Sequence, residues 1–286
     1  MKILVTGATG FIGNHLIKEL LKDINNEIIA TSRDIKKVTR CEWFSKVKYI
    51  SYDLNNTDVL NLFEYFDKPD RVIHLAWDGL PNYNDLIHIE KNLFSNYHFI
   101  KNLISNGLKD ITIIGTCFEY GLVNGCLSED LQTNPSNSYA IAKDSLKKFI
   151  EELKKQYDFN YKWVRLFYMY GEGQSEKSVI ALLNKAMLNG EKEFSMSGGE
   201  QLRDYLHIQE VASNISKISL QNIINNQVIN CCSGEPISIR KFVEKYLDEK
   251  SYSMKLNLGY YPYPNYEPMA FWGDNTKLQK ILNEQM

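Results

Sequence analysis

The feature that most constrains this chain is a glycine-rich turn that follows a short apolar run near its beginning. The run Ile3–Val5 leads into Thr6–Gly13 (TGATGFIG), and an amphipathic pattern then continues to about Lys22. In such a strand–turn–helix unit, the first glycine permits a tight turn, the second lets the backbone approach a pyrophosphate, and the third lets the helix pack closely on the strand. Because amides at the start of the helix attract phosphate, the segment predicts a dinucleotide site. The expected contacts are Gly7, Thr9, Gly10, Phe11, Ile12 and Gly13.

The end of the second expected strand bears on which dinucleotide is bound. Ile28–Thr31 is followed by Ser32 and Arg33, where a site for NAD usually presents a carboxylate to the ribose hydroxyls. A hydroxyl and a guanidinium suit a 2′-phosphate better, so the sequence favours NADP, with NADPH as the reduced form. Asp34 comes next and would take the acidic part if the strand ended later, which keeps NAD as the alternative.

Other cofactor contacts are expected at the ends of the following strands. Asp53, followed by Leu54, would accept a hydrogen bond from the adenine amino group or cap a helix, and both interpretations stay open. The expected set further includes Leu75, Ala76, Trp77 and Asn92.

The spacing of apolar runs predicts the fold class. Short β-branched runs without polar alternation are typical of strands buried on both faces of a parallel sheet that helices cover. The expected strands are Ile3–Val5, Ile28–Thr31, Val47–Ser51, Val72–Ala76, Ile111–Ile114 and Trp163–Phe167. We therefore predict an α/β fold with a doubly wound parallel (Rossmann) sheet.

The alternation of predicted strands and helices changes after Gly171. Helical patterns over Ser178–Asn189 and Ile239–Lys250 are separated by turn-rich segments, and Leu258–Gly273 is too rich in Tyr and Pro to be regular helix. We expect an NADP-binding Rossmann domain over residues 1–170, to which the chain returns around 204–230. A smaller mixed α/β substrate-binding lobe would span residues 171–286.

Composition limits the classes of partner. The chain has 33 basic and 35 acidic residues, so no long-range field favours nucleic acid or a membrane surface. It has no apolar run of membrane-spanning length and begins directly with a strand pattern, from which we expect a cytoplasmic protein. The 5 cysteines lack CxxC spacing and the 5 histidines are scattered, so neither a disulfide framework nor a metal site is expected.

Three residues are expected to form one catalytic unit. Tyr139 and Lys143 stand on an amphipathic segment at a spacing that places both on one helix face. The ammonium group would lower the pKa of the phenol from about 10 toward neutrality, as a general acid or base requires. Thr116 follows the run Ile111–Ile114, so its hydroxyl would lie beyond the carboxyl end of a strand and could donate to a carbonyl oxygen. Tyr139 and Lys143 would also contact the cofactor.

The glycine triplet and this catalytic set resemble those of the extended short-chain dehydrogenase/reductase family, which includes NAD-dependent epimerases and dehydratases. The resemblance covers nearly the whole chain. Arg165–Gly171 (RLFYMYG), Arg203–Ile208 (RDYLHI) and Cys232–Ile239 (CSGEPISI) are similar to downstream segments of the family. It implies a nucleotide diphosphate sugar as substrate and a homodimer built from the helices within residues 85–106 and 136–156.

The resemblance also implies substrate contacts in the second lobe. Arg203 would face the substrate diphosphate as a fork, whereas Tyr168 replaces an asparagine that commonly bonds this pyrophosphate, so that contact must change or come from elsewhere. The tyrosines at 260, 261, 263 and 266 would either stack on a base or sugar or simply pack the tail. The expected substrate contacts are Cys117, Phe118, Tyr168, Arg203 and Tyr261.

The residues after Thr116 narrow the reaction. Dehydratases of the family carry an acid/base pair, usually Asp-Glu, directly after the threonine, whereas this chain has Cys117 and Phe118. Glu119 is displaced by one residue along what should still be strand, which would turn its side chain to the opposite face. Cys117 is either an acid/base group or a small apolar strand residue. Hydride transfer to a keto carbon, with a proton from Tyr139, is the chemistry that remains.

The tail segment 266–274 (YEPMAFWGD) resembles that of reductases that complete deoxysugars such as CDP-abequose or dTDP-fucose. We expect NADPH-dependent reduction of a nucleotide-linked 4-keto-6-deoxy sugar in deoxysugar or surface-polysaccharide biosynthesis. One alternative is an NAD-dependent C4 epimerase, against which Ser32 and Arg33 argue. The other is a non-catalytic NADP-binding sensor, against which the intact catalytic set argues.

Overall fold

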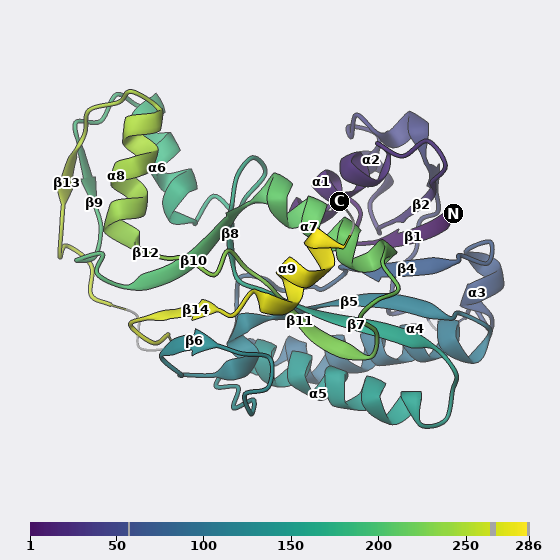
Figure 1. Ribbon diagram of the computed structural model, residues 1–286. Helices are drawn as coiled ribbons and strands as arrows, with labels where there is room; N and C mark the ends of the chain where they lie inside the picture. The colour runs from purple at the N-terminus through teal and green to yellow at the C-terminus, as the bar shows by residue number, and fades with distance from the viewer. Residues whose placement is uncertain (57, 264–266, 285–286) are drawn as a thin grey trace.

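The central element of the fold is a parallel sheet. A computed structural model describes residues 1–56, 58–263 and 267–284, and in this part of the chain seven strands form one sheet in the order β11-β7-β5-β4-β1-β2-β3 (Figure 1). The strands are β1 (Lys2–Thr6), β2 (Glu27–Thr31), β3 (Lys48–Tyr49), β4 (Arg71–His74), β5 (Asp110–Thr116), β7 (Asn160–Leu166) and β11 (Gln227–Cys231). All their pairings are parallel. All 7 residues of β5 are buried, as expected of a strand covered on both faces.

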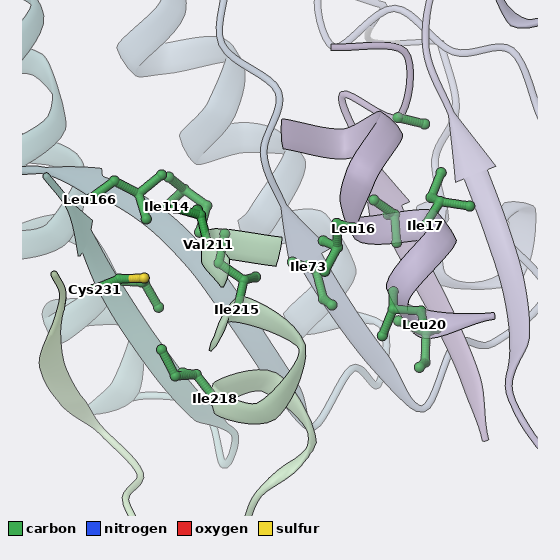
Figure 2. Close-up of a cluster of buried hydrophobic side chains, with 14 of the residues drawn as sticks. Leu16, Ile17, Leu20, Ile73, Ile114, Leu166, Val211, Ile215, Ile218 and Cys231 are labelled. Atoms are coloured by element: carbon green, nitrogen blue, oxygen red, sulfur yellow. The ribbon is translucent and has the colours of Figure 1, made fainter. Parts of the chain in front are cut away.

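Helices cover both faces of this sheet, which confirms the predicted doubly wound Rossmann fold. One face carries α1 (Phe11–Leu20), α7 (Ile208–Leu220) and α9 (Thr276–Asn283), and the other carries α3 (Leu62–Tyr65), α4 (Leu93–Ser105) and α5 (Ser138–Lys154). Figure 2 shows the first of these two cores, in which Val211, Ile215 and Ile218 of α7 point toward Ile114 of β5 and Cys231 of β11.

Two elements from the end of the chain complete the Rossmann core. Strand β11 pairs with β7 in parallel, and its Gln227 and Asn230 explain why the apolar runs did not reveal it. Helix α9 buries Leu278 and Ile281 in the core shared with α1. The chain therefore returns to the sheet with its last described helix as well as around 204–230.

A smaller lobe lies beyond the carboxyl ends of the strands, at the left of Figure 1. It contains a three-stranded sheet, β12-β10-β8, a pair β13-β9, and two helices that enclose a separate apolar core. The elements are β8 (Tyr168–Tyr170), α6 (Val179–Leu188), β9 (Glu193–Ser195), β10 (Leu202–His207), β12 (Pro236–Ser238), α8 (Ile239–Glu249) and β13 (Lys255–Asn257). A further pair, β6 (Gly125–Leu127) and β14 (Phe271–Gly273), lies between the lobe and the main sheet.

Short helical turns connect several strands. They are α2 (Ile35–Val38), a 3-10 turn over Phe44–Lys46, a π-helical turn over His88–Asn92 and a 3-10 turn over Cys117–Tyr120. Within residues 1–56, 58–263 and 267–284, no helix combines the length and apolar character needed to cross a membrane.

Candidate functional site

The glycine-rich turn forms one wall of a cavity of about 430 Å³ at the carboxyl ends of β1, β2 and β4. Gly7 adopts a φ of +66°, and a Cβ there would lie 2.9 Å from the Ala76 amide nitrogen. A Cβ on Gly13 would lie 2.3 Å from the Gly7 carbonyl oxygen, so this glycine is required for the first turn of α1 to pack on the loop. The turn thus brings bare backbone to the cavity, as a bound pyrophosphate requires.

Most of the predicted cofactor residues line this cavity. They are Gly7, Thr9, Gly10, Ser32, Arg33, Asp53, Leu54, Leu75, Ala76, Trp77 and Asn92. Five others, Phe11, Ile12, Gly13, Tyr139 and Lys143, are not among its lining residues: the first three belong to α1, and the last two lie on α5. Seven further residues line the cavity that the sequence did not predict, because they belong to no recognisable sequence motif. They are Thr31, Lys37, Tyr52, Asn55, Asp78, Ser95 and Asn96.

The residues after β2 differ from the sequence-based prediction in their partners. Arg33 donates from both terminal nitrogens to the carboxylate of Asp78, at 2.8 and 3.2 Å. Asp34 accepts from the amides of Lys36 and Lys37 and so caps α2. The guanidinium predicted to meet a 2′-phosphate is therefore held by a carboxylate across the same cavity, and the pKa of Asp78 is lowered chiefly by this contact.

Asp53 caps no helix among the described elements, and its contact with adenine stays a prediction. Its Oδ1 accepts from the backbone and side-chain nitrogens of Asn55, at 3.0 and 2.7 Å, which fixes a local turn. The same residue lines the cavity.

The structure brings the predicted catalytic residues together. Thr116 ends β5, and its side chain hydrogen-bonds the phenol of Tyr139. Asn137 caps the start of α5 through the Ala140 amide, which places Tyr139 in the first turn of this helix. One turn later, the ammonium group of Lys143 donates to the Ile114 carbonyl oxygen at 2.8 Å.

The protonation of this unit departs from the prediction. Burial raises the pKa of the Tyr139 phenol, and nearby Tyr83 and Glu119 raise it further, so the expected lowering of this pKa toward neutrality is wrong. Burial also lowers the pKa of Lys143 to about 7, against a smaller opposing effect of Glu119. The phenol is thus a proton donor at neutral pH, and Lys143 titrates near it. The Lys143 ammonium lies 3.9 Å from the centroid of the Trp77 ring, a cation–π contact that favours its charged form.

We expected Glu119 to lie in a strand, but the structure places it in a 3-10 turn. Strand β5 ends at Thr116, so the period of two stops there and the side chain turns back beneath the catalytic threonine. Its carboxylate accepts from the Thr116 amide at 2.9 Å, from the Trp163 indole at 3.0 Å and from Arg165 Nε at 2.7 Å. Glu119 is fully buried and its carboxylate is bound by these donors, so it is not available to a substrate.

A second cavity, of about 760 Å³, lies between the two parts of the molecule. It is lined by residues 81–85, by Asn137, by β8 and by the start of α6. Tyr83 links this cavity to the catalytic unit, because its ring lies 5.8 Å from that of Tyr139 and 5.1 Å from that of Phe118. The volume lies in the range of sites for ligands of drug size and larger.

Among the predicted substrate residues, only Tyr168 lines this cavity in the described part of the chain. Arg203 is fully buried, and its guanidinium contacts Glu267, which lines the cavity in its place. Cys117 is buried, and burial raises its thiol pKa, which suits a packing residue. Tyr261 is exposed and packs on its neighbour Tyr260. Tyr266 lies outside the described residues.

Glu267 could not have been found from spacing. Its Oε1 accepts from the Tyr168 hydroxyl at 2.6 Å across 99 residues of chain, and its Oε2 accepts from Arg203 at 2.7 Å. The only signal in the sequence was the tail segment 266–274 to which it belongs, and the similarity of that segment to reductases gave no role to an individual residue.

Comparisons with known proteins agree with this arrangement. The family model described as "NAD dependent epimerase/dehydratase family" matches residues 3–232. The dTDP-6-deoxy-L-talose 4-dehydrogenase (NAD(+)) of Aggregatibacter actinomycetemcomitans is 28% identical over 96% of this chain and 99% of its own. The dTDP-4-dehydro-6-deoxyglucose reductase of Escherichia coli is 28% identical over 85% of this chain and 79% of its own.

Solved structures extend the similarity to three dimensions. UDP-glucuronic acid 4-epimerase from Bacillus cereus, in complex with UDP-glucuronic acid and NAD, superposes with a TM-score of 0.82 at 27% identity, over 99% of this chain and 93% of that one. The overall fold of this chain is therefore similar to that of a solved 4-epimerase. The chain belongs to the NAD-dependent epimerase/dehydratase family, whose members modify nucleotide sugars.

Proposed function

We propose that this protein reduces the keto group of a nucleotide-linked 4-keto-6-deoxy sugar. The observation that carries the proposal is the buried Thr116–Tyr139–Lys143 unit, in which the phenol is held in its protonated form. A carbonyl oxygen beside Thr116 would accept a proton from Tyr139 as hydride reaches the carbon. The raised pKa suits a general acid, which reduction requires, better than a resting base.

Dehydration finds no second acid/base group here. Phe118 packs on Tyr83, the Cys117 thiol is kept protonated by burial, and the carboxylate of Glu119 is bound by Arg165 and Trp163. The names of the two relatives that act at a 4-position of dTDP-linked 6-deoxy sugars point to the same oxidation and reduction chemistry. Epimerisation at C4 is the second candidate, because similar solved structures are 4-epimerases.

The first cavity suits a nicotinamide dinucleotide, since a Cβ at Gly7 or Gly13 would fill the cradle for its phosphates. When bound, this cofactor supplies the hydride. We infer that the cofactor is NAD: the family is described as NAD dependent, and similar structures hold NAD. The sequence-based preference for NADP is not confirmed, because Asp78 holds the guanidinium that a 2′-phosphate would need.

The second cavity would hold the nucleotide diphosphate sugar. The start of α6, capped by Ser178, and the cation Lys177 both line it and would meet phosphate oxygens. The homodimer expected from α4 and α5 and the individual site residues remain predictions.

The test is a reaction of purified protein with NADH or NADPH and a panel of 4-keto-6-deoxy sugars linked to dTDP, CDP, GDP or UDP, followed at the nicotinamide absorbance. We expect oxidation that depends on one of the sugars. Tyr139→Phe should bind the dinucleotide unchanged and lose about 100-fold or more in turnover. If the dinucleotide binds and no sugar is reduced, the reductase proposal fails and a sensor gains support.

A further inference from the structure

Arg203, the residue that the family would use for the substrate diphosphate, is buried in this chain and binds protein groups through its terminal nitrogens. Arg203 is 0% exposed, and it donates to the Leu202 carbonyl oxygen at 2.8 Å and to Glu267 at 2.7 Å. Its guanidinium also lies 4.7 Å from the centroid of the Phe271 ring. Glu267 is thus the charged group that this cluster presents to the cavity.

Glu267 is held in one orientation but retains capacity to bind a ligand. Its side chain is 12% exposed, and each carboxylate oxygen accepts one hydrogen bond, from Tyr168 or from Arg203. Two oxygens offer about four acceptor positions, so about two remain toward the cavity. Burial raises the pKa of Tyr168, and the charge of Glu267 raises it further, so the phenol stays a donor to the carboxylate.

Glu267 is paired with the buried Arg203, and the described lining of the cavity adds one cation and one further anion. Among the described residues, the charged side chains that line it are Asp85, Lys177 and Glu267. Lys177 stands at the start of α6, where the diphosphate is proposed to bind. Tyr168, by contrast, has its ring 6.4 Å from that of Phe118, two residues from the catalytic threonine. Glu267 therefore belongs to the sugar end of the cavity.

We propose that Glu267 determines which sugars this site accepts: its carboxylate binds a hydroxyl or amino group of a neutral or cationic sugar and excludes sugars that carry a carboxylate. This proposal rests on the proposed function, since it assumes a nucleotide sugar in this cavity. A hydroxyl can donate to the fixed carboxylate of Glu267, whereas a second carboxylate would place a like charge against its acceptor oxygens, and the Arg203 guanidinium behind them is already paired. The site would thus differ from that of the similar structure that holds UDP-glucuronic acid.

The test compares UDP-glucose with UDP-glucuronic acid, two probes that differ in one carboxylate, by calorimetry on the protein loaded with NAD. The wild type should bind UDP-glucose at least about tenfold more tightly. Glu267→Gln should bring the two affinities within about threefold, mainly by strengthening UDP-glucuronic acid. Tyr168→Phe is the matched control, because it removes one contact of the same carboxylate but keeps the charge, and its selectivity should persist.

Glu267→Gln leaves a buried arginine without its counter-ion, so the double variant R203M/E267Q is made as well, and both are checked for a cooperative thermal transition. Unchanged selectivity in a folded variant of either kind overturns the proposal, as does a wild type that binds both probes equally or binds neither. If selectivity follows Glu267 while no keto sugar is reduced, the reductase function fails and the Glu267 proposal stands. If a keto sugar is reduced but the selectivity does not change with Glu267, the Glu267 proposal fails and the reductase function stands.

Discussion

The strand pair β5 and β7 carries a buried ion pair at each end, and only the pair at the carboxyl end contacts the proposed catalytic unit. At the amino end, Lys162 contacts both oxygens of Asp110 at 2.7 Å. At the carboxyl end, Arg165 contacts Glu119 at 2.7 Å, and this carboxylate also holds the Thr116 amide. The pairs are alike in chemistry and burial, so only their place relative to the catalytic unit separates a structural contact from one that positions a catalytic residue.

The largest expected effect is on stability, and it should be similar at both ends. Asp110→Asn and Glu119→Gln each leave a buried cation without its counter-ion, which typically costs about 3–5 kcal/mol of unfolding free energy. Denaturant titrations of both variants measure this cost. A much smaller loss for Asp110→Asn would show that the amino-end pair is relaxed by solvent, since its carboxylate side chain is 12% exposed.

The next effect separates the two ends. Burial lowers the pKa of Lys143 to about 7, and Glu119 opposes this shift. Because the ammonium form exists below that pKa, kcat/KM should fall as pH rises through about 7. Glu119→Gln should move this fall to lower pH, whereas Asp110→Asn should leave it in place. A fall at the same pH in all three proteins would refute the role of Glu119 in the charge state of Lys143.

The smallest effect extends the comparison to an exposed pair. Arg33 and Asp78 are about half exposed, so their contact should contribute only about 0–1 kcal/mol to stability. Its role would lie in cofactor choice: Asp78→Asn should free Arg33 and raise the efficiency with NADPH relative to NADH by about tenfold. Arg33→Ala is the control, and it should abolish this gain. An unchanged ratio in Asp78→Asn would exclude Arg33 from cofactor choice.

The sequence predicted the local features of the molecule but not the contacts between residues that are far apart in the chain. Features that depend on the backbone and on local spacing were predictable: the Gly7 turn, the six apolar strands, and Thr116 with Tyr139 and Lys143. What depended on partners across the chain was not. Arg33 meets Asp78 from the segment that follows β4, and the Glu119 side chain turns back because β5 ends at Thr116. Glu267 reaches Tyr168 across 99 residues, which no periodic pattern can indicate.

The pKa of Tyr139 was misjudged for a related reason. The spacing to Lys143 predicted an attractive charge, but burial of the phenol has the larger effect and raises its pKa. The extent of burial depends on how α5 and the segment that contains Trp77 and Tyr83 close over the site, and that closure is a property of the folded chain.

In the proposed reaction, Tyr139 delivers a proton while hydride is added permanently to a sugar carbonyl. The most direct measurement uses reduced dinucleotide deuterated at its transferable position with the 4-keto-6-deoxy sugar that the wild type accepts, and analyses the product by mass spectrometry and NMR. The proposed reduction should place deuterium at C4 in proportion to the dinucleotide oxidised, and almost none with Tyr139→Phe. Interconversion of C4 epimers without net oxidation of the dinucleotide would contradict it.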